Sequence, residues 1–156
     1  MDKIIITEET ARRFNEANQN SLYSNLGIEI IPSDDGAIHA TMPVDERTCQ
    51  LFGYINGGAN LALAETVTGL GSVMLVEPDE GVVGMQVNGS HIHAVHVGGS
   101  VHAKCTLIHM GKTTHVWDAE MRDSQGRLAC VVRVTNFIFK LKDGKHNNLS
   151  LKALKK

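Results

Sequence analysis

Apolar and polar residues alternate along much of the chain, as they do in strands with one buried face. The alternation is loose over residues 26–31 and resumes over 37–42, and the Asp34-Asp35-Gly36 turn between these stretches predicts a β-hairpin. Further alternating stretches follow at residues 82–95, 100–109, 114–122 and 128–139. We therefore predict that the second half of the chain is a β meander.

Helical patterns occur in two other places. Thr7 is a suitable N-cap, and apolar residues recur at helical spacing between Ala11 and Ala17, which predicts a short amphipathic helix ending near Asn20. From Gly57 to about residue 76 no polar stripe is present at any helical period, so we expect a helix that is buried on every side. A curved sheet around one central helix is an α+β architecture, which we predict for this chain.

Neither a membrane nor a nucleic acid is expected as a partner. Small residues dominate the central apolar segment, and Glu65 near its middle would be costly in lipid. The formal net charge of −2 gives no footprint for nucleic acid, which needs many uncompensated Lys and Arg residues.

The 156 residues correspond to one domain, which we place at residues 1–139. Residues 140–156 hold six lysines against one aspartate and are interpreted as a basic tail. Such a tail is either a solvated terminus or a means of steering an anionic ligand.

Cysteine usage and the start of the chain favour a cytoplasmic protein. Cys49, Cys105 and Cys130 are odd in number and form no Cys-x-x-Cys motif, which argues against both a disulfide framework and a zinc knuckle. The first residues lack the cationic start and the apolar stretch of a secretory signal.

The eight histidines raise the question of a metal site, above all in His91-x-His93-x-x-His96. On a strand, His91 and His93 share one face, whereas His96 falls on the other, and no carboxylate or Cys is adjacent. We expect no metal.

Glu65 is the only residue with a charged side chain between Arg47 and Glu77. Burial of an unpaired carboxylate is costly, so such a residue needs a partner or a purpose. Either a backbone amide, Lys or Arg satisfies Glu65, or its carboxylate is a nucleophile or general base in a pocket.

Gly57-Gly58 at the start of the helix leaves backbone N–H groups that no Cβ shields, which suits a carbonyl oxygen gaining negative charge. Gly57 and Glu65 are eight positions apart, about 12 Å along one helix. One chain cannot place both on a single carbonyl carbon, so chemistry that uses both requires two protomers. We therefore expect a homodimer or a homotetramer.

Several motifs between residues 25 and 139 carry a family resemblance: Met42-Pro43-Val44-Asp45, Arg47, Gln50, Phe52-Gly53, Asn56-Gly57-Gly58-Ala59, Leu63-Ala64-Glu65, Val82-Val83-Gly84, Asn88, His91, His109-Met110-Gly111, Val116-Trp117, Asp123 and Gly126-Arg127-Leu128. On these motifs the chain resembles the hotdog-fold acyl-CoA thioesterases, in particular the 1,4-dihydroxy-2-naphthoyl-CoA and phenylacetate-pathway group. The resemblance implies a hotdog fold, hydrolysis of an acyl-CoA to free acid and coenzyme A, a dimer or tetramer, and no metal or added cofactor.

The resemblance also implies residue roles. Glu65 would be the catalytic carboxylate, Gly57 the polarising N–H, and Gln50 would hold the thioester from the partner chain. Contacts to the coenzyme moiety are implied for Ser90, His91, His93, Gly111, Lys112 and Thr113. Within this set Lys112 is the natural phosphate cation, although residues 111–113 also fit a simple hairpin turn.

Two departures from the family pattern concern the site. Asn56 stands where those enzymes usually have His, and an Asn amide can donate a hydrogen bond but cannot carry a proton at neutral pH. Gly69 stands where relatives often place Ser or Thr, four residues after Glu65. We predict hydrolysis of an aryl-CoA or a similar thioester; the alternative is a non-catalytic ligand-binding hotdog protein. A hotdog dehydratase is disfavoured because it would need a His paired with the carboxylate.

Overall fold

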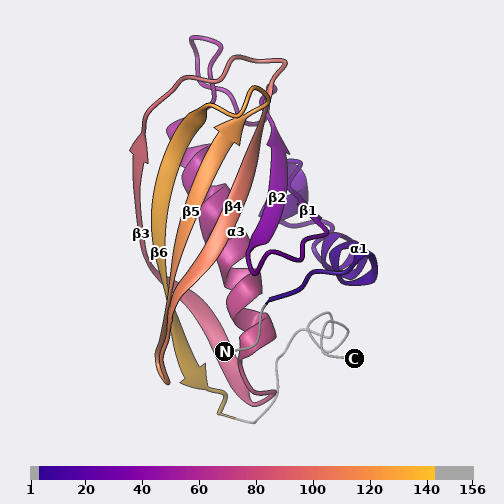
Figure 1. Cartoon of the computed structure of the whole chain (residues 1–156), viewed down its shortest axis with the longest axis vertical. Coiled ribbons are helices and arrows are strands. Elements are labelled where there is room, and N and C mark those ends of the chain that lie inside the picture. Colours follow the sequence, from indigo (N-terminus) through magenta and orange to yellow (C-terminus); the bar gives the residue numbers. More distant parts are fainter. Residues whose placement is uncertain (1–3, 143–156) are drawn as a thin grey trace.

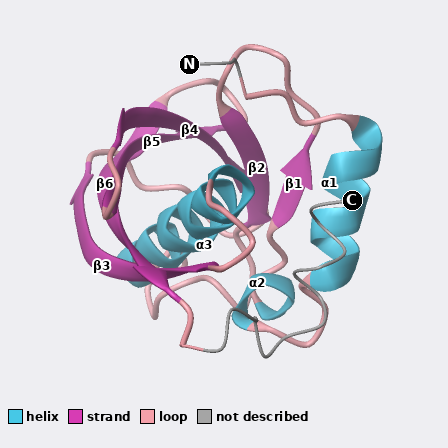
Figure 2. Ribbon diagram, turned by 90° about the horizontal axis from the view of Figure 1, so that it is seen from below, coloured by secondary structure: helices cyan, strands magenta, loops and turns pink. Residues whose placement is uncertain are grey.

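The computed structural model describes residues 4–142, and the long apolar helix lies at its centre (Figure 1). The elements in chain order are α1 (Glu8–Ala17), α2 (Leu22–Asn25), β1 (Glu29–Ile31), β2 (Ile38–Pro43), α3 (Gly57–Leu75), β3 (Glu80–His91), β4 (Ser100–Met110), β5 (Thr114–Asp123) and β6 (Leu128–Lys140). Seen from below, α3 lies inside the curve of the sheet (Figure 2). The predicted α+β architecture is confirmed.

The sheet has the order β1-β2-β4-β5-β6-β3, and every neighbouring pair is antiparallel. The hairpin of β1 and β2 is confirmed. The prediction of a meander is wrong for β3, which pairs with β6 at the far edge and not with β4. The connection after β3 crosses the start of α3, held by hydrogen bonds from the Ile55 N–H to the Val95 O (2.8 Å) and from the Val97 N–H to the Gly53 O (3.0 Å). Strand β3 therefore ends at His91 and does not extend to residue 95.

The N-terminal helix is confirmed, with Thr7 as N-cap accepting a hydrogen bond from the Thr10 N–H at 3.1 Å. It ends at Ala17, earlier than expected, and Asn20 follows with a left-handed φ of 60°. Asn15 on this helix bonds both the N–H (2.9 Å) and the O (3.0 Å) of Ile30 in β1. The outer edge of β1 is thereby covered.

A buried polar cluster fixes α3 against the sheet. The Trp117 indole N–H donates to the Ser72 hydroxyl at 2.9 Å, and the Asn136 amide donates to the same hydroxyl at 3.0 Å and to the Thr68 O at 3.1 Å. All four residues are buried. Because these bonds are directional, they set the rotation of α3 about its axis as well as its distance from the sheet.

The prediction that α3 is buried on every side is wrong within one chain. The sheet covers a face with Leu63, Val67 and Gly71, but Glu65 is exposed. The stripe on this uncovered face consists of residues that are exposed or half-buried: Gly58, Ala62, Glu65 and Gly69. Small side chains on this face explain why the sequence shows no polar stripe.

Of the basic tail expected at residues 140–156, only residues 140–142 lie within the described part of the chain. Within residues 4–142 no helix is long and apolar enough to span a membrane.

Two glycines of α3 provide a test of this packing. At Gly71 a Cβ would lie 2.5 Å from the Ile38 Cδ1 and 2.8 Å from the Trp117 Cη2, whereas at Gly69 nothing lies within 4 Å. We expect Gly71→Ala to lower the free energy of unfolding by about 1–3 kcal/mol through overpacking. We expect Gly69→Ala to raise it by about 0.5–1 kcal/mol through helix propensity.

Urea unfolding at a fixed protomer concentration measures both changes. Equal effects of the two substitutions would contradict the assignment of the packed and open faces of α3.

Candidate active site

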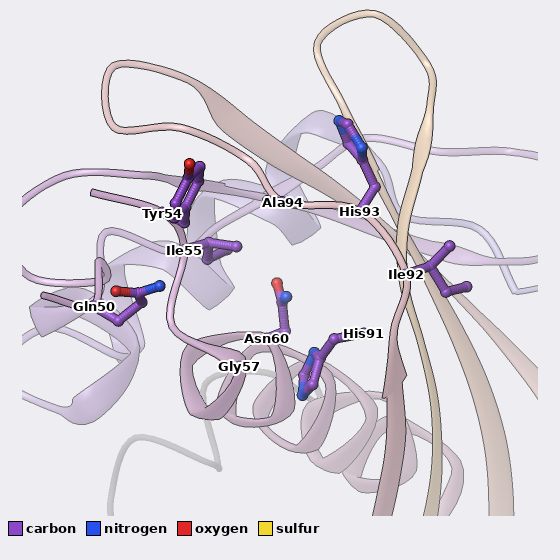
Figure 3. A pocket seen from close by; sticks show the side chains of 9 residues that line it. All are labelled: Gln50, Tyr54, Ile55, Gly57, Asn60, His91, Ile92, His93 and Ala94. Atoms are coloured by element: carbon purple, nitrogen blue, oxygen red, sulfur yellow. The ribbon is translucent and has the colours of Figure 1, made fainter. Parts of the chain in front are cut away.

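A cavity of about 330 Å³ opens at the N-terminal end of α3 (Figure 3). Three segments line it: the loop with Gln50, Tyr54 and Ile55, the first helical turn with Gly57 and Asn60, and the segment His91–Ala94. The cavity therefore combines a helix N-terminus, where the Gly57 N–H is free, with imidazole and amide side chains.

Gly57 and His91 meet in this cavity. A Cβ at Gly57 would lie 2.6 Å from the His91 Nε2, so the imidazole packs directly on the glycine. Among the described residues none accepts a hydrogen bond from the Gly57 N–H. A helix N-terminus carries partial positive charge, so a ligand oxygen beside Gly57 would meet both this charge and the His91 ring.

Cys130 contacts the other side of the His91 ring. Its Sγ lies 3.3 Å from the His91 Nδ1. Burial raises the pKa of the Cys130 thiol to about 11, so this group is a neutral thiol at physiological pH and a poor nucleophile. Its place in the site is that of a contact that orients the imidazole.

Asn56 and Gln50 lie at the entrance to the helix with side-chain oxygens already bonded. The Asn56 Oδ1 is the N-cap and accepts from the Gly58 N–H at 2.8 Å, and Asn56 does not line the cavity. The Gln50 Oε1 accepts from the Phe52 N–H, and this side chain does line the cavity. The roles expected for both residues toward a thioester stay predictions.

Asn60 is a cavity residue that the sequence analysis did not identify. It is 2% exposed, its Oδ1 has no hydrogen-bond partner among the described residues, and Figure 3 shows the side chain rising from α3 into the cavity. An uncompensated buried amide is costly, so it requires a water or a ligand group. The signal in the sequence was an amide side chain in the first turn of a helix in which apolar and small residues predominate.

Glu65 lies two turns further along α3 and does not line the cavity. Its carboxylate has no hydrogen bond or ion pair with any described residue, and it lies beside Gly84 of β3. The hypothesis that a backbone amide, Lys or Arg satisfies Glu65 is therefore not supported in residues 4–142. About 12 Å of helix separates Gly57 from Glu65, as the sequence predicted.

The residues expected to bind the coenzyme moiety fall into two groups. His91 and His93 line the cavity, and the His93 Nε2 lies 3.6 Å from the Asp123 Oδ2. Ser90 lines a separate groove beside Arg133.

The second coenzyme group is the turn of residues 111–113, which lies at the opposite end of α3. It lines a cavity of about 650 Å³ that includes Leu75, the last residue of the helix. The 18 residue steps of α3 correspond to about 27 Å, so one chain does not bring Lys112 near Gly57. Between residues 4 and 142, no three His, Cys, Asp or Glu side chains converge as metal ligands.

Comparisons with family models, solved structures and known relatives all lead to the same protein family. A model described as the thioesterase superfamily matches residues 52–130. The crystal structure of a thioesterase from Haemophilus influenzae superimposes with a TM-score of 0.82 at 37% sequence identity, covering 91% of this chain and 99% of that one. The 1,4-dihydroxy-2-naphthoyl-CoA hydrolase of Escherichia coli is 34% identical over 129 residues, which is 83% of this chain and 94% of the relative.

A thioesterase from Streptococcus pneumoniae, crystallised with coenzyme A, shares the fold at a TM-score of 0.65 and 24% identity, over 74% of this chain and 90% of that one. The hotdog fold expected from the sequence is confirmed by these likenesses.

The environment of Cys130 predicts low reactivity. Because its pKa rises from 9.0 to about 11, its thiolate fraction at pH 8 falls about 100-fold. We expect iodoacetamide to alkylate Cys130 in the folded protein at least 100-fold more slowly than in the urea-unfolded chain, as followed by peptide mass spectrometry. Equal rates in the two states would show that the thiol is neither buried nor held against His91.

Proposed function

The chain belongs to the thioesterase superfamily, and from this premise we propose that it hydrolyses an aryl-CoA or similar acyl-CoA thioester at a site shared between two protomers. The observation that carries the proposal is Glu65, the one charged residue of α3, whose exposed carboxylate has no partner among the described residues. A carboxylate in the middle of an otherwise uncharged stripe would be costly to cover with a second protomer unless it serves chemistry there.

In the proposed reaction the thioester oxygen lies on the Gly57 N–H. Negative charge develops on this oxygen when the carbonyl carbon is attacked, and the positive end of α3 stabilises it. The His91 Nε2, which packs on Gly57, offers a second polar contact at the same place. Asn56 stands where the family pattern has a His, and His91 of β3 thus provides an imidazole at the same place.

The attacking group is the carboxylate of the second protomer. The partner's Glu65 either takes a proton from a water whose oxygen attacks the carbonyl carbon, or attacks this carbon itself to form a mixed anhydride that water then cleaves. In both routes the C–S bond breaks, coenzyme A leaves as a thiolate that is then protonated, and the free acid is released.

Two surfaces of the chain support pairing with a second copy. The uncovered stripe of α3 carries the small residues Gly58 and Ala62 on the N-terminal side of Glu65, which permit close approach of another helix. The outer edge of β3 pairs with no strand within residues 4–142, and the apolar side chains Val83 and Met85 of β3 are 49% and 59% exposed. An open apolar edge favours association.

The coenzyme fits the same arrangement. If two α3 helices run antiparallel, the turn with Lys112, which lies beside the C-terminal end of one helix, faces the Gly57 end of the other, so the partner's Lys112 can reach a phosphate of a thioester bound at Gly57. The relative from Streptococcus pneumoniae, crystallised with coenzyme A, supports an acyl-CoA ligand, and the Escherichia coli relative supports an aryl acid. Unpaired cysteines suit a reducing compartment, and we expect the reaction to occur in the cytoplasm.

Substitution of the carboxylate tests the chemistry. We expect Glu65→Gln, which keeps the shape and removes the charge, to lower kcat on benzoyl-CoA, hydroxybenzoyl-CoA or fatty acyl-CoA by about 10²–10⁴-fold. Glu29→Gln, at an exposed glutamate of β1, is the control and should retain the parental rate. Undiminished turnover in Glu65→Gln would overturn the mechanism, whereas tight coenzyme A binding without turnover by the parent would favour a non-catalytic binding protein.

Mixing of variants tests the shared site. Gly57→Pro removes the N–H donor at the first helical position, and its Cβ, which would lie 2.6 Å from the His91 Nε2, also displaces the imidazole from this end of the site. Asn56 already has the extended ψ of 132° that precedes Pro readily. We expect Gly57→Pro and Glu65→Gln to be inactive alone. After unfolding and refolding together, half of the dimers should be mixed and carry one intact site of two, so about a quarter of the parental activity should return. No recovery from the mixture would place both residues in one protomer's site.

A further inference from the structure

Strand β3 passes the tip of Glu65 at Gly84. A Cβ at Gly84 would overlap the Glu65 Oε1 and would lie 3.2 Å from its Cδ and 3.5 Å from its Cγ. The space that a side chain of β3 would fill is therefore occupied by the carboxylate of α3.

Backbone conformation does not explain this glycine. The φ of Gly84 lies outside the left-handed range, so the backbone here is open to any residue. Glycine within a strand weakens it by roughly 0.5–1 kcal/mol relative to Ala. The register shift between Gly84 and Gln86 marks a bulge, with Met85 as the extra residue, 59% exposed. Space for the neighbouring side chain is the remaining reason for Gly at this position.

The helix side of the contact is fixed independently. Gly84 lies opposite Asn136 in the register of β3 and β6, and the Asn136 amide bonds the Thr68 O and the Ser72 hydroxyl of α3. Asn136 thus contacts both α3, whose rotation it helps to fix, and β3, the strand that Glu65 faces. Because these bonds hold the backbone of α3, the direction of the Glu65 side chain depends on the space that β3 leaves beside Gly84.

We propose that Gly84 is a positioning residue, whose missing side chain lets the Glu65 carboxylate lie against β3 at the bulge. This inference rests on the proposed function, because it concerns the place that the carboxylate needs in order to act. Any side chain at position 84 displaces the end of Glu65 without disturbing the core, because the displaced atoms belong to a flexible and exposed side chain. Displacement of about 1 Å at a catalytic group is enough to lower a rate about 100-fold.

Gly84→Ala tests the inference against a matched substitution in the same strand. We expect Gly84→Ala to lower kcat at least tenfold with KM for the acyl-CoA within twofold, and to leave the urea midpoint unchanged or raised. The control is Gly89→Ala, whose Cβ would lie 2.6 Å from the Leu61 Cδ2 of α3 and so presses on an apolar side chain of the same helix. It should keep kcat within twofold.

Combination with a shorter acid separates positioning from general damage to β3. Aspartate is one methylene shorter than glutamate, so its carboxylate ends before the space above Gly84. We expect Glu65→Asp alone to be slow, and Gly84→Ala combined with Glu65→Asp to be no slower than Glu65→Asp alone. The two losses would then be strongly non-additive.

Multiplying losses in the double variant, an equal loss of kcat in Gly89→Ala, or failure of Gly84→Ala to fold would each overturn the inference. The proposed function has a separate outcome. Full turnover in Glu65→Gln refutes that function, whereas an inactive Glu65→Gln beside a fully active Gly84→Ala refutes only the role of Gly84.

Discussion

The hydroxyl of Ser72, which accepts hydrogen bonds from Trp117 and Asn136, fixes the rotation of α3, and the geometry of the whole site depends on it. Successive residues of a helix are rotated by about 100°, so a change in rotation by a single residue would turn Glu65 away from β3. The two donors come from adjacent strands, β5 and β6, and are buried with their acceptor. If only apolar contacts held α3 on the sheet, they would define the distance between helix and sheet but not the rotation of the helix about its axis.

With the rotation fixed, the N-terminus, the covered face and the open face of α3 have different roles. Its N-terminus presents a free N–H at Gly57 to the cavity, its covered face packs on Trp117, and its open face presents Glu65. The separation between the donor and the acid is set by the rise of the helix and cannot be shortened within one chain. The small residues of the open face and the unpaired edge of β3 lie on the side that bears the acid, whereas the edge of β1 is covered by Asn15. The proposed dimer places a second copy on that side, with its carboxylate at the start of this α3.

Features set by local sequence could be predicted, and features set by long-range pairing could not. Thr7 and Gly57 mark helix starts through backbone hydrogen bonding within a few residues, so α1 and α3 were predicted, whereas the short α2 was not, and alternation located the strands. Alternation says nothing about the partner of a strand, which is why β3 was placed beside β4 when it pairs with β6. Nor does an apolar helix reveal whether its own sheet or another molecule covers it, so Glu65 was expected to be buried.

The candidate site shows the same division. Gly57 and Glu65 could be selected from the sequence because each is unusual for its own position. Asn60 and Cys130 could not, because their importance comes from contacts with the cavity and with His91, 31 residues from Asn60 along the chain. The Asn56 side chain serves as the helix cap, a role that a family motif does not reveal but that any Asn before a helix can take.

Several glycines of this fold lie where a side chain of a neighbouring element packs directly on the backbone. In the described helices and strands, five glycines without a positive φ have a side chain of another element where a Cβ would stand: Gly57, Gly71, Gly81, Gly84 and Gly89. At Gly57 the neighbour is the His91 imidazole, and at Gly84 it is the Glu65 carboxylate, so the two candidate catalytic side chains each lie against a glycine of the facing element. Because an ordinary backbone conformation does not require Gly, space for the neighbouring side chains explains Gly at these positions. At both ends of the site β3 thus approaches α3 so closely that a side chain of one element lies on a glycine of the other. This close approach limits the positions that the Glu65 carboxylate and the His91 imidazole can take on an otherwise open surface.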